Sequence, residues 1–217
     1  MPKIAEEARA ARRDQIIAAA AGCFARAGYH ATTMADIAEA AEVSKGTPYL
    51  YFPSKEALFI ALYEEWDCGL AARVDAAVGA LAGPAHRSPR NVLAAVASAI
   101  AAHVLDNPQT CRVLMEATTL AAYEPAIAAK VQTANAETHG QLTGLFEAGV
   151  AAGEWPAGTD PALQARLFTA GLYGLMAQWH TAPGSFSLEA AMDALAGTGT
   201  AGPGGDGGIS EAKGAVS

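Results

Sequence analysis

Apolar residues recur every three or four positions along most of this chain, which is the spacing of one face of an α-helix. The first apolar stripe predicts a helix over about residues 6–27, with Gly28 as a left-handed cap at its end. A second short helix is predicted after Thr33, because Asp36 stands three positions later in a capping-box arrangement.

A third short helix is predicted over residues 45–51, where Ser44 is a good N-cap and Pro53 ends the pattern. Ser54 then caps a fourth helix, whose apolar side extends as far as Trp66. Three short helices, of which the last two are separated by a tight turn, are the arrangement of a helix-turn-helix.

The chain up to residue 196 continues as one predicted helix after another, because prolines and glycines interrupt the apolar pattern at intervals. These helices are predicted over residues 67–81, 89–106, 108–122, 125–152, 161–181 and 187–196. The glycine-rich segment 197–217 has too little apolar bulk to fold, so we expect a disordered tail. The sequence therefore predicts an N-terminal domain at residues 1–53 and a helical domain at residues 54–196.

Composition agrees with an all-α fold. Of the 217 residues, 52% are hydrophobic and only 7% are aromatic, and alanine, the best helix former, dominates the apolar set. The apolar run at residues 92–102 is too short to span a bilayer, and the charged N-terminus lacks a signal-peptide stretch. We therefore expect a cytoplasmic protein with no membrane partner. The three cysteines show no metal-ligand or redox spacing, and we expect neither a metal nor a cofactor.

The third helix and its flanks carry side chains suited to DNA. Lys45 supplies positive charge, Gly46 lets the backbone approach closely, and Thr47 offers a hydroxyl and a methyl group to bases or phosphates. Tyr49 and Tyr51 carry phenolic donors that suit phosphate oxygens. The predicted DNA-binding residues are Thr33, Ser44, Lys45, Gly46, Thr47, Tyr49, Tyr51 and Lys55.

The overall charge of the chain does not by itself favour DNA binding. The net charge is −8, and residues 1–66 hold seven basic and nine acidic residues, so this region is not basic as a whole. DNA affinity must therefore come from the placement of charges and from dimerisation. Lys55, at the first turn of the fourth helix, is expected to reach a phosphate and not a base.

The N-terminal region resembles the tetracycline-repressor (TetR) family of transcription regulators. The resemblance lies in residues 16–20, in Phe24 with Gly28 and Tyr29, and in residues 32–38 and 43–58. It implies three DNA-binding helices, a fourth linking helix, a ligand-binding domain, and a homodimer formed by the last two helices. It also implies double-stranded DNA, a palindromic operator, as the partner, with a small molecule as the effector that releases it.

Two residues depart from the family pattern. Glu42 occupies the turn position where glycine is common, and a left-handed glutamate there would cost about 1 kcal/mol. Pro48 stands early in the recognition helix, where it removes one backbone N–H. Neither change removes the helix-turn-helix pattern.

The helical domain offers few polar or aromatic side chains in an alanine-rich background. We expect His103, Arg112, Glu116 and Tyr123 to line a pocket between the middle helices, although each on its own also fits an ordinary core or surface position. The candidate ligand-binding residues are His103, Arg112, Glu116, Tyr123, Phe146 and Tyr173. The excess of acidic residues in this domain favours neutral or cationic ligands.

Two other classes of function are weighed against a ligand-controlled repressor. An enzyme, or a helical small-molecule-binding protein without DNA regulation, is one alternative, but no catalytic motif or phosphate-binding loop is found. A helical adaptor that has lost DNA binding is the other, and the intact set from Lys45 to Lys55 argues against it.

Overall fold

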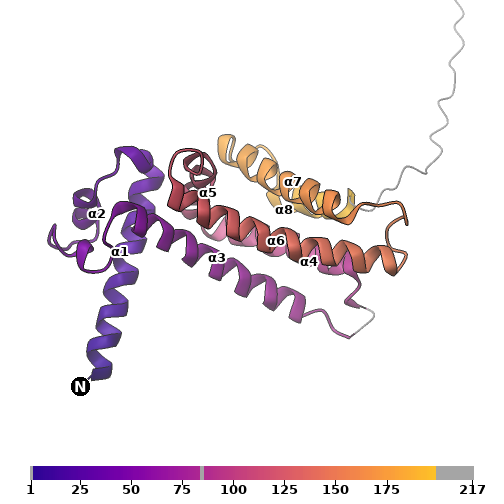
Figure 1. Ribbon diagram of the computed structural model, residues 1–217, viewed down its shortest axis with the longest axis horizontal. Coiled ribbons are helices and arrows are strands. Elements are labelled where there is room, and N and C mark those ends of the chain that lie inside the picture. The colour runs from indigo at the N-terminus through magenta and orange to yellow at the C-terminus, as the bar shows by residue number, and fades with distance from the viewer. Residues whose placement is uncertain (1, 84–85, 199–217) are drawn as a thin grey trace, which may run out of the picture.

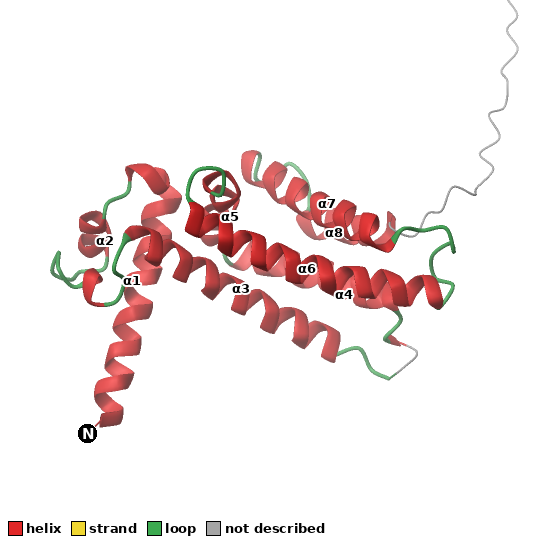
Figure 2. Cartoon of the chain, viewed as in Figure 1, coloured by secondary structure: helices red, strands yellow, loops and turns green. Residues whose placement is uncertain are grey.

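The structure, a computed structural model, describes residues 2–83 and 86–198. These residues form eight α-helices and one 3₁₀ helix, and no strand occurs among them, as the all-α prediction requires (Figure 2). The elements are α1 (Pro2–Ala31), α2 (Met34–Ala40), η1 (Pro48–Leu50), α3 (Lys55–Gly79), α4 (Pro89–Asp106), α5 (Pro108–Leu120), α6 (Pro125–Ala151), α7 (Pro161–Thr181) and α8 (Leu188–Thr198). Figure 1 shows α1 and α2 at one end, with α3 leading from them along the elongated bundle of the later helices.

Helix α1 is kinked at Gly28, whose φ of 77° and ψ of 167° lie outside the helical region. The sequence predicted a helix end at Gly28, and its positive φ ends the first helical stretch there; a second, short helical stretch follows as far as Ala31. Aromatic rings close the core around this point, since Phe59 packs edge-on against both Phe24 and Tyr29, with ring centroids 5.4 and 5.2 Å away.

The capping box predicted for α2 is present. Asp36 donates its backbone N–H to the Thr33 hydroxyl at 3.2 Å, and the Asp36 carboxylate accepts the Thr33 N–H at 2.8 Å. The turn after α2 passes through Glu42 with a φ of 53°, as expected from the glycine that family members often carry there. A short, left-handed turn thus separates α2 from the segment that follows it.

The third helix is shorter than predicted. Residues 45–47 form turns, and only Pro48–Leu50 form one turn of 3₁₀ helix. Pro48 stands at the start of that turn, where its missing N–H costs nothing. The Ser44 hydroxyl is bonded to the Thr47 hydroxyl at 2.7 Å rather than to a backbone N–H.

Helix α3 corrects a second expectation. Two helices were predicted, ending at Trp66 and beginning at residue 67, but the structure has one continuous helix of 25 residues. No proline breaks it, and Gly69 is accommodated in its middle because the His103 ring packs there, 3.2 Å from where a Cβ would stand. The remaining helices lie within two residues of their predicted bounds.

Two apolar clusters form the core. The first joins α1, α2 and the start of α3 to residues of α5 and α6, among them Val113, Ala117 and Ile127. The second lies between α4 and the later helices, around Phe146 and Met192. The first cluster therefore crosses the domain boundary that we expected after residue 53. The described part of the tail, Gly197 and Thr198, ends α8, and the rest of the segment 197–217 lies outside the described residues.

None of the described helices combines the length and the apolar character that crossing a bilayer requires. Within the same residues, no group of three or more histidine, cysteine or acidic side chains is arranged to hold a metal ion.

Candidate functional sites

The turn segment around η1 projects from the N-terminal end of the molecule. Tyr49 is 56% exposed and Leu50 is 74% exposed, while Pro48 and Phe52 are buried and anchor the segment from below. A Cβ built on Gly46 would meet nothing within 4 Å. A segment that enters a DNA groove needs large exposed side chains, together with buried residues that hold it against the rest of the protein.

The N-terminal half of α1 flanks this segment through its arginines. The Arg9 guanidinium lies 5.9 Å from the Tyr51 ring centroid, and that of Arg13 lies 5.5 Å from the Phe52 ring. Arg13 also pairs with Glu65 of α3 at 2.9 Å. These cations, which oppose the α1 dipole, thus stand beside the exposed turn, where they add positive charge.

Lys55 is placed differently from the sequence-based expectation. Its ammonium donates to the backbone carbonyls of Tyr29 at 2.6 Å and Thr32 at 2.9 Å, and it lies 4.4 Å from the Tyr29 ring centroid. These carbonyls follow the α1 kink. Lys55 therefore ties the start of α3 to the end of α1, and its contact with a phosphate stays a prediction. The Thr33 side chain is likewise occupied by its cap.

A second tie reaches the same kink from α5. The Glu116 carboxylate accepts the backbone N–H of Tyr29 at 2.7 Å. A Cβ on Gly28 would stand 3.2 Å from the same carboxylate oxygen. The kink of α1 is thus held from one side by α3 and from the other by α5.

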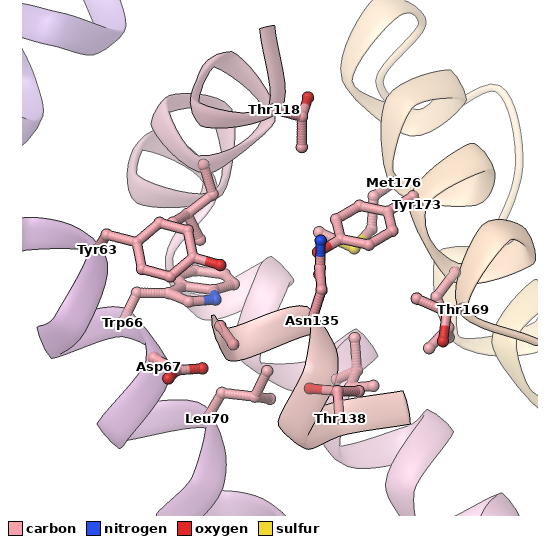
Figure 3. A pocket seen from close by; sticks show the side chains of 14 residues that line it. Tyr63, Trp66, Asp67, Leu70, Thr118, Asn135, Thr138, Thr169, Tyr173 and Met176 are labelled. Carbon is pink, nitrogen blue, oxygen red and sulfur yellow. The ribbon is translucent and has the colours of Figure 1, made fainter. Parts of the chain in front are cut away.

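A cavity of about 120 Å³ lies between α3, α5, α6 and α7 (Figure 3). Tyr63, Trp66 and Asp67 line it from α3, and Asn135 and Tyr173 face them from α6 and α7. The Tyr173 hydroxyl lies 3.4 Å from the Asn135 side-chain oxygen. Burial, with a contribution from the charge of Asp67, raises the pKa of both tyrosines, so both phenols stay protonated at neutral pH.

A larger cavity of about 420 Å³ continues from the first, between α3, α4, α6 and α7. Both are lined by Asp67, Leu70, Ile100, Ala134, Thr138 and Leu172. Together they have the size and the apolar lining of a small-molecule site.

Of the six predicted ligand-binding residues, Tyr173 lines the smaller of these two cavities and the other five line neither. Phe146 is a core residue packed on Trp155, and His103 packs on Trp66 with ring centroids 4.2 Å apart. Arg112 and Tyr123 are exposed, and Glu116 binds the kink of α1. His103, Arg112, Glu116 and Tyr123 thus line neither of the two cavities, and a pocket that they share stays a prediction.

The sequence contained a usable signal for the cavity. Tyr63, Trp66, Asp67 and Leu70 stand three, one and three positions apart, which places them on one face of a helix. The predicted break at residue 67 divided that face between two helices and concealed it.

Comparisons with known proteins agree with this architecture. The model described as "Bacterial regulatory proteins, tetR family" matches residues 16–62, and that described as "BetI-type transcriptional repressor, C-terminal" matches residues 89–198, half of the chain. The chain belongs to the tetR family of bacterial regulatory proteins. Its helix-turn-helix is therefore α2 with the turn segment around η1.

Two curated transcription regulators match part of this chain. The HTH-type transcriptional repressor Rv1474c of Mycobacterium tuberculosis is 43% identical over 65 residues, which are 30% of this chain and 35% of that protein. The HTH-type transcriptional regulator RutR of Escherichia coli K12 is 46% identical over 55 residues, 25% of this chain and 26% of the relative. The matched region thus spans about a third or less of these relatives.

Solved structures share the whole fold. The fatty acid degradation regulator FadR from Bacillus halodurans superposes with a TM-score of 0.77 at 21% identity, covering 88% of this chain and 96% of that one. The transcriptional regulator FadR from Bacillus subtilis, solved in complex with stearoyl-CoA, has a TM-score of 0.75 at 24% identity. This superposition covers 86% of this chain and 96% of that one. At these identities the likeness establishes the tetR-type fold and no ligand.

Proposed function

We propose that this protein is a transcription repressor that binds a palindromic operator as a homodimer and leaves it when a small molecule fills the α3–α7 cavity. The observation that carries the proposal is the course of α3. Its first residue, Lys55, binds the end of α1 beside the helix-turn-helix, and its residues Tyr63, Trp66 and Asp67 line the cavity. A ligand that shifts α3 therefore affects the cavity and also the position of the helix-turn-helix.

The DNA-binding part of the proposal assigns different roles to neighbouring residues. Lys45, Tyr49 and Leu50 are the exposed side chains that enter the groove, while Arg9 approaches the DNA backbone beside them. Phosphate contacts supply affinity, and side chains at base edges supply sequence preference. A single N-terminal region with more acidic than basic residues binds weakly, so two copies on a symmetric site are needed.

The surface of α7 supports the homodimer. Leu163 is 50% exposed and Leu167 is 55% exposed, and a Cβ on Gly174 would meet nothing within 4 Å. Gly171, by contrast, is used within the chain, because a Cβ there would stand 2.6 Å from the Leu195 side chain. Gly174→Trp is expected to convert the dimer to monomer in sedimentation at micromolar concentration, and an unchanged dimer would remove α7 from the interface.

The ligand part draws support from a relative. The structure of Bacillus subtilis FadR is a complex with stearoyl-CoA, so a tetR-family fold of this kind accommodates an elongated amphiphile. The two connected cavities here are elongated along α3 and apolar over most of their lining. We propose a binding function in the cytoplasm, with no catalytic step.

Fluorescence anisotropy with labelled DNA from the region beside the protein's own coding sequence tests the proposal. We expect tight binding to that fragment, weaker binding to scrambled DNA, and release by at least one member of a panel of amphiphilic metabolites. Coupling of about 1–3 kcal/mol corresponds to a roughly 5–150-fold loss of DNA affinity. A protein that binds panel members but no DNA would instead be the helical small-molecule-binding protein weighed above.

A further inference from the structure

The charged side chains that line the two cavities are all acidic. Asp67 lines both of them, and Asp75 and Glu137 line the larger one. Among the described residues, no lysine, arginine or histidine lines either cavity. An anionic head group placed inside would therefore meet only negative charge, which opposes its binding.

Asp67 stands where the two cavities meet. Within the described part of the chain, its carboxylate takes part in no hydrogen bond and no salt bridge, although it is only partly exposed. The neighbouring cations are engaged elsewhere, since Arg73 pairs with Asp106 at 2.7 Å and Lys130 pairs with Glu64 at 3.3 Å. The Asp67 carboxylate is therefore available to pair with a cationic ligand.

Aromatic residues line the same cavity as this carboxylate. In Figure 3 the Tyr63 hydroxyl and the Asp67 carboxylate extend from α3 toward Asn135 and Tyr173 on the opposite side, with the Trp66 indole beside them. Tyr63, Trp66 and Tyr173 line the smaller cavity together with Asp67, and the charge of Asp67 contributes to the raised pKa of both tyrosines. Aromatic rings attract a desolvated cation, and they do so without requiring hydrogen bonds from it.

We infer that the effector is an amphiphilic cation, whose ammonium group lies against Asp67 among Tyr63, Trp66 and Tyr173 and whose apolar tail occupies the larger cavity. This inference rests on the proposed function, because it names the ligand of the same cavity. It sets the protein apart from the acyl-CoA-bound FadR structure, whose ligand carries negative charge. The apolar tail contacts residues such as Leu70, Ile100 and Leu172.

Calorimetry on the full-length protein with four probes of equal tail length tests the inference: decyltrimethylammonium, decanol, decanoate and decanoyl-coenzyme A, each below its micelle concentration. We expect the ammonium to bind about tenfold more tightly than the alcohol, and both anions to bind more weakly than the alcohol. Tightest binding by decanoate or decanoyl-coenzyme A would overturn the inference, as would the absence of binding by the ammonium.

Two variants separate charge recognition from folding. Asp67→Asn preserves shape and removes the charge, so it should weaken the ammonium about tenfold and leave decanol within about twofold. Glu147→Gln removes the same charge from an exposed position of α6 outside both cavities, and it should change neither affinity by more than about twofold. An equal loss for ammonium and alcohol in Asp67→Asn contradicts the inference.

The same probes in the DNA-release assay distinguish failure of the inference from failure of the proposed function. Release by decanol or decanoyl-coenzyme A, but not by the ammonium, overturns the cation inference and leaves the ligand-controlled repressor in place. Binding of the ammonium with the expected dependence on Asp67, but without loss of DNA affinity, supports the site chemistry and contradicts the repressor mechanism.

Discussion

The Glu116 carboxylate of α5 accepts the backbone N–H of Tyr29 at 2.7 Å, immediately after the one residue of α1 with a positive φ, Gly28. The contact joins residues that are 87 positions apart in the chain. It fixes the kink of α1, and with it the helix-turn-helix, to a helix whose Thr118 lines the smaller cavity. The contact is thus a second path, beside α3, from the cavity to the DNA-binding end.

Glu116→Ala tests this path. The substitution leaves the Tyr29 N–H without its charged partner, so we expect the free energy of unfolding to fall by about 1.5–3 kcal/mol in urea denaturation. Because the kink is then held only by Lys55, we also expect a smaller difference in DNA affinity between the ligand-free and ligand-bound protein. Glu147→Ala, at an exposed position of α6, is the control and should change neither quantity measurably.

Lys55→Met distinguishes a structural lysine from a phosphate contact. The methionine keeps the apolar stem and loses the bonds to the Tyr29 and Thr32 carbonyls, so stability without DNA should fall by about 1–2 kcal/mol. The slope of log K against log salt should stay near that of the unmodified protein. Unchanged stability with a slope reduced by about 0.9 per half-site would instead identify a phosphate contact.

Gly46→Ala separates DNA approach from folding. A Cβ at this position meets open space in the free protein, so the melting temperature should be nearly unchanged. Operator and scrambled DNA should both bind more weakly, because the methyl group holds the backbone away from the duplex. Lys45→Ala is the companion variant, with a loss of about 1–3 kcal/mol per half-site that is larger on operator than on scrambled DNA. Equal operator affinity in Gly46→Ala would show that this backbone does not approach DNA closely.

His103 makes stability depend on pH. Burial, with a contribution from the Arg73 charge, lowers its pKa below the ordinary value of 6.5, while Asp106 opposes the shift. The unfolded chain then binds the proton more tightly, so stability is fully present above about pH 6.5 and declines as the pH falls through the range down to the folded pKa.

Urea denaturation at about pH 7.5 and about pH 5.5 measures this effect. His103→Leu should reduce the loss of stability between the two pH values, because the titrating group is gone. His86→Leu, at an exposed position, is the control and should preserve the loss. An identical pH dependence in His103→Leu would assign the acid sensitivity to other groups, such as His180, whose pKa burial also lowers.

The local signals in the sequence determined the ends of most helices. Capping patterns at Thr33 and Ser54 predicted the starts of α2 and α3, and each caps its helix in the structure. Prolines likewise predicted the starts of α4 to α7, because proline is compatible with a helix start and not with a helix interior. Each of these helices begins with its proline. The helix-turn-helix followed from these short-range rules and from the family resemblance.

The tertiary structure decided those features that depend on contacts between residues far apart in the chain. Lys55 has a sequence position that suits a phosphate, but the folded chain brings to its ammonium two carbonyls of α1 and that of Thr32, just beyond its end. Glu116 was assigned to a pocket, and the fold places it at the kink beside Tyr29. The cavity itself arises where α3, α6 and α7 meet, and the separation between such helices depends on side chains far apart in the chain. No local pattern encodes that separation, so Asp67 became a candidate only once Asn135 and Tyr173 were seen to face it.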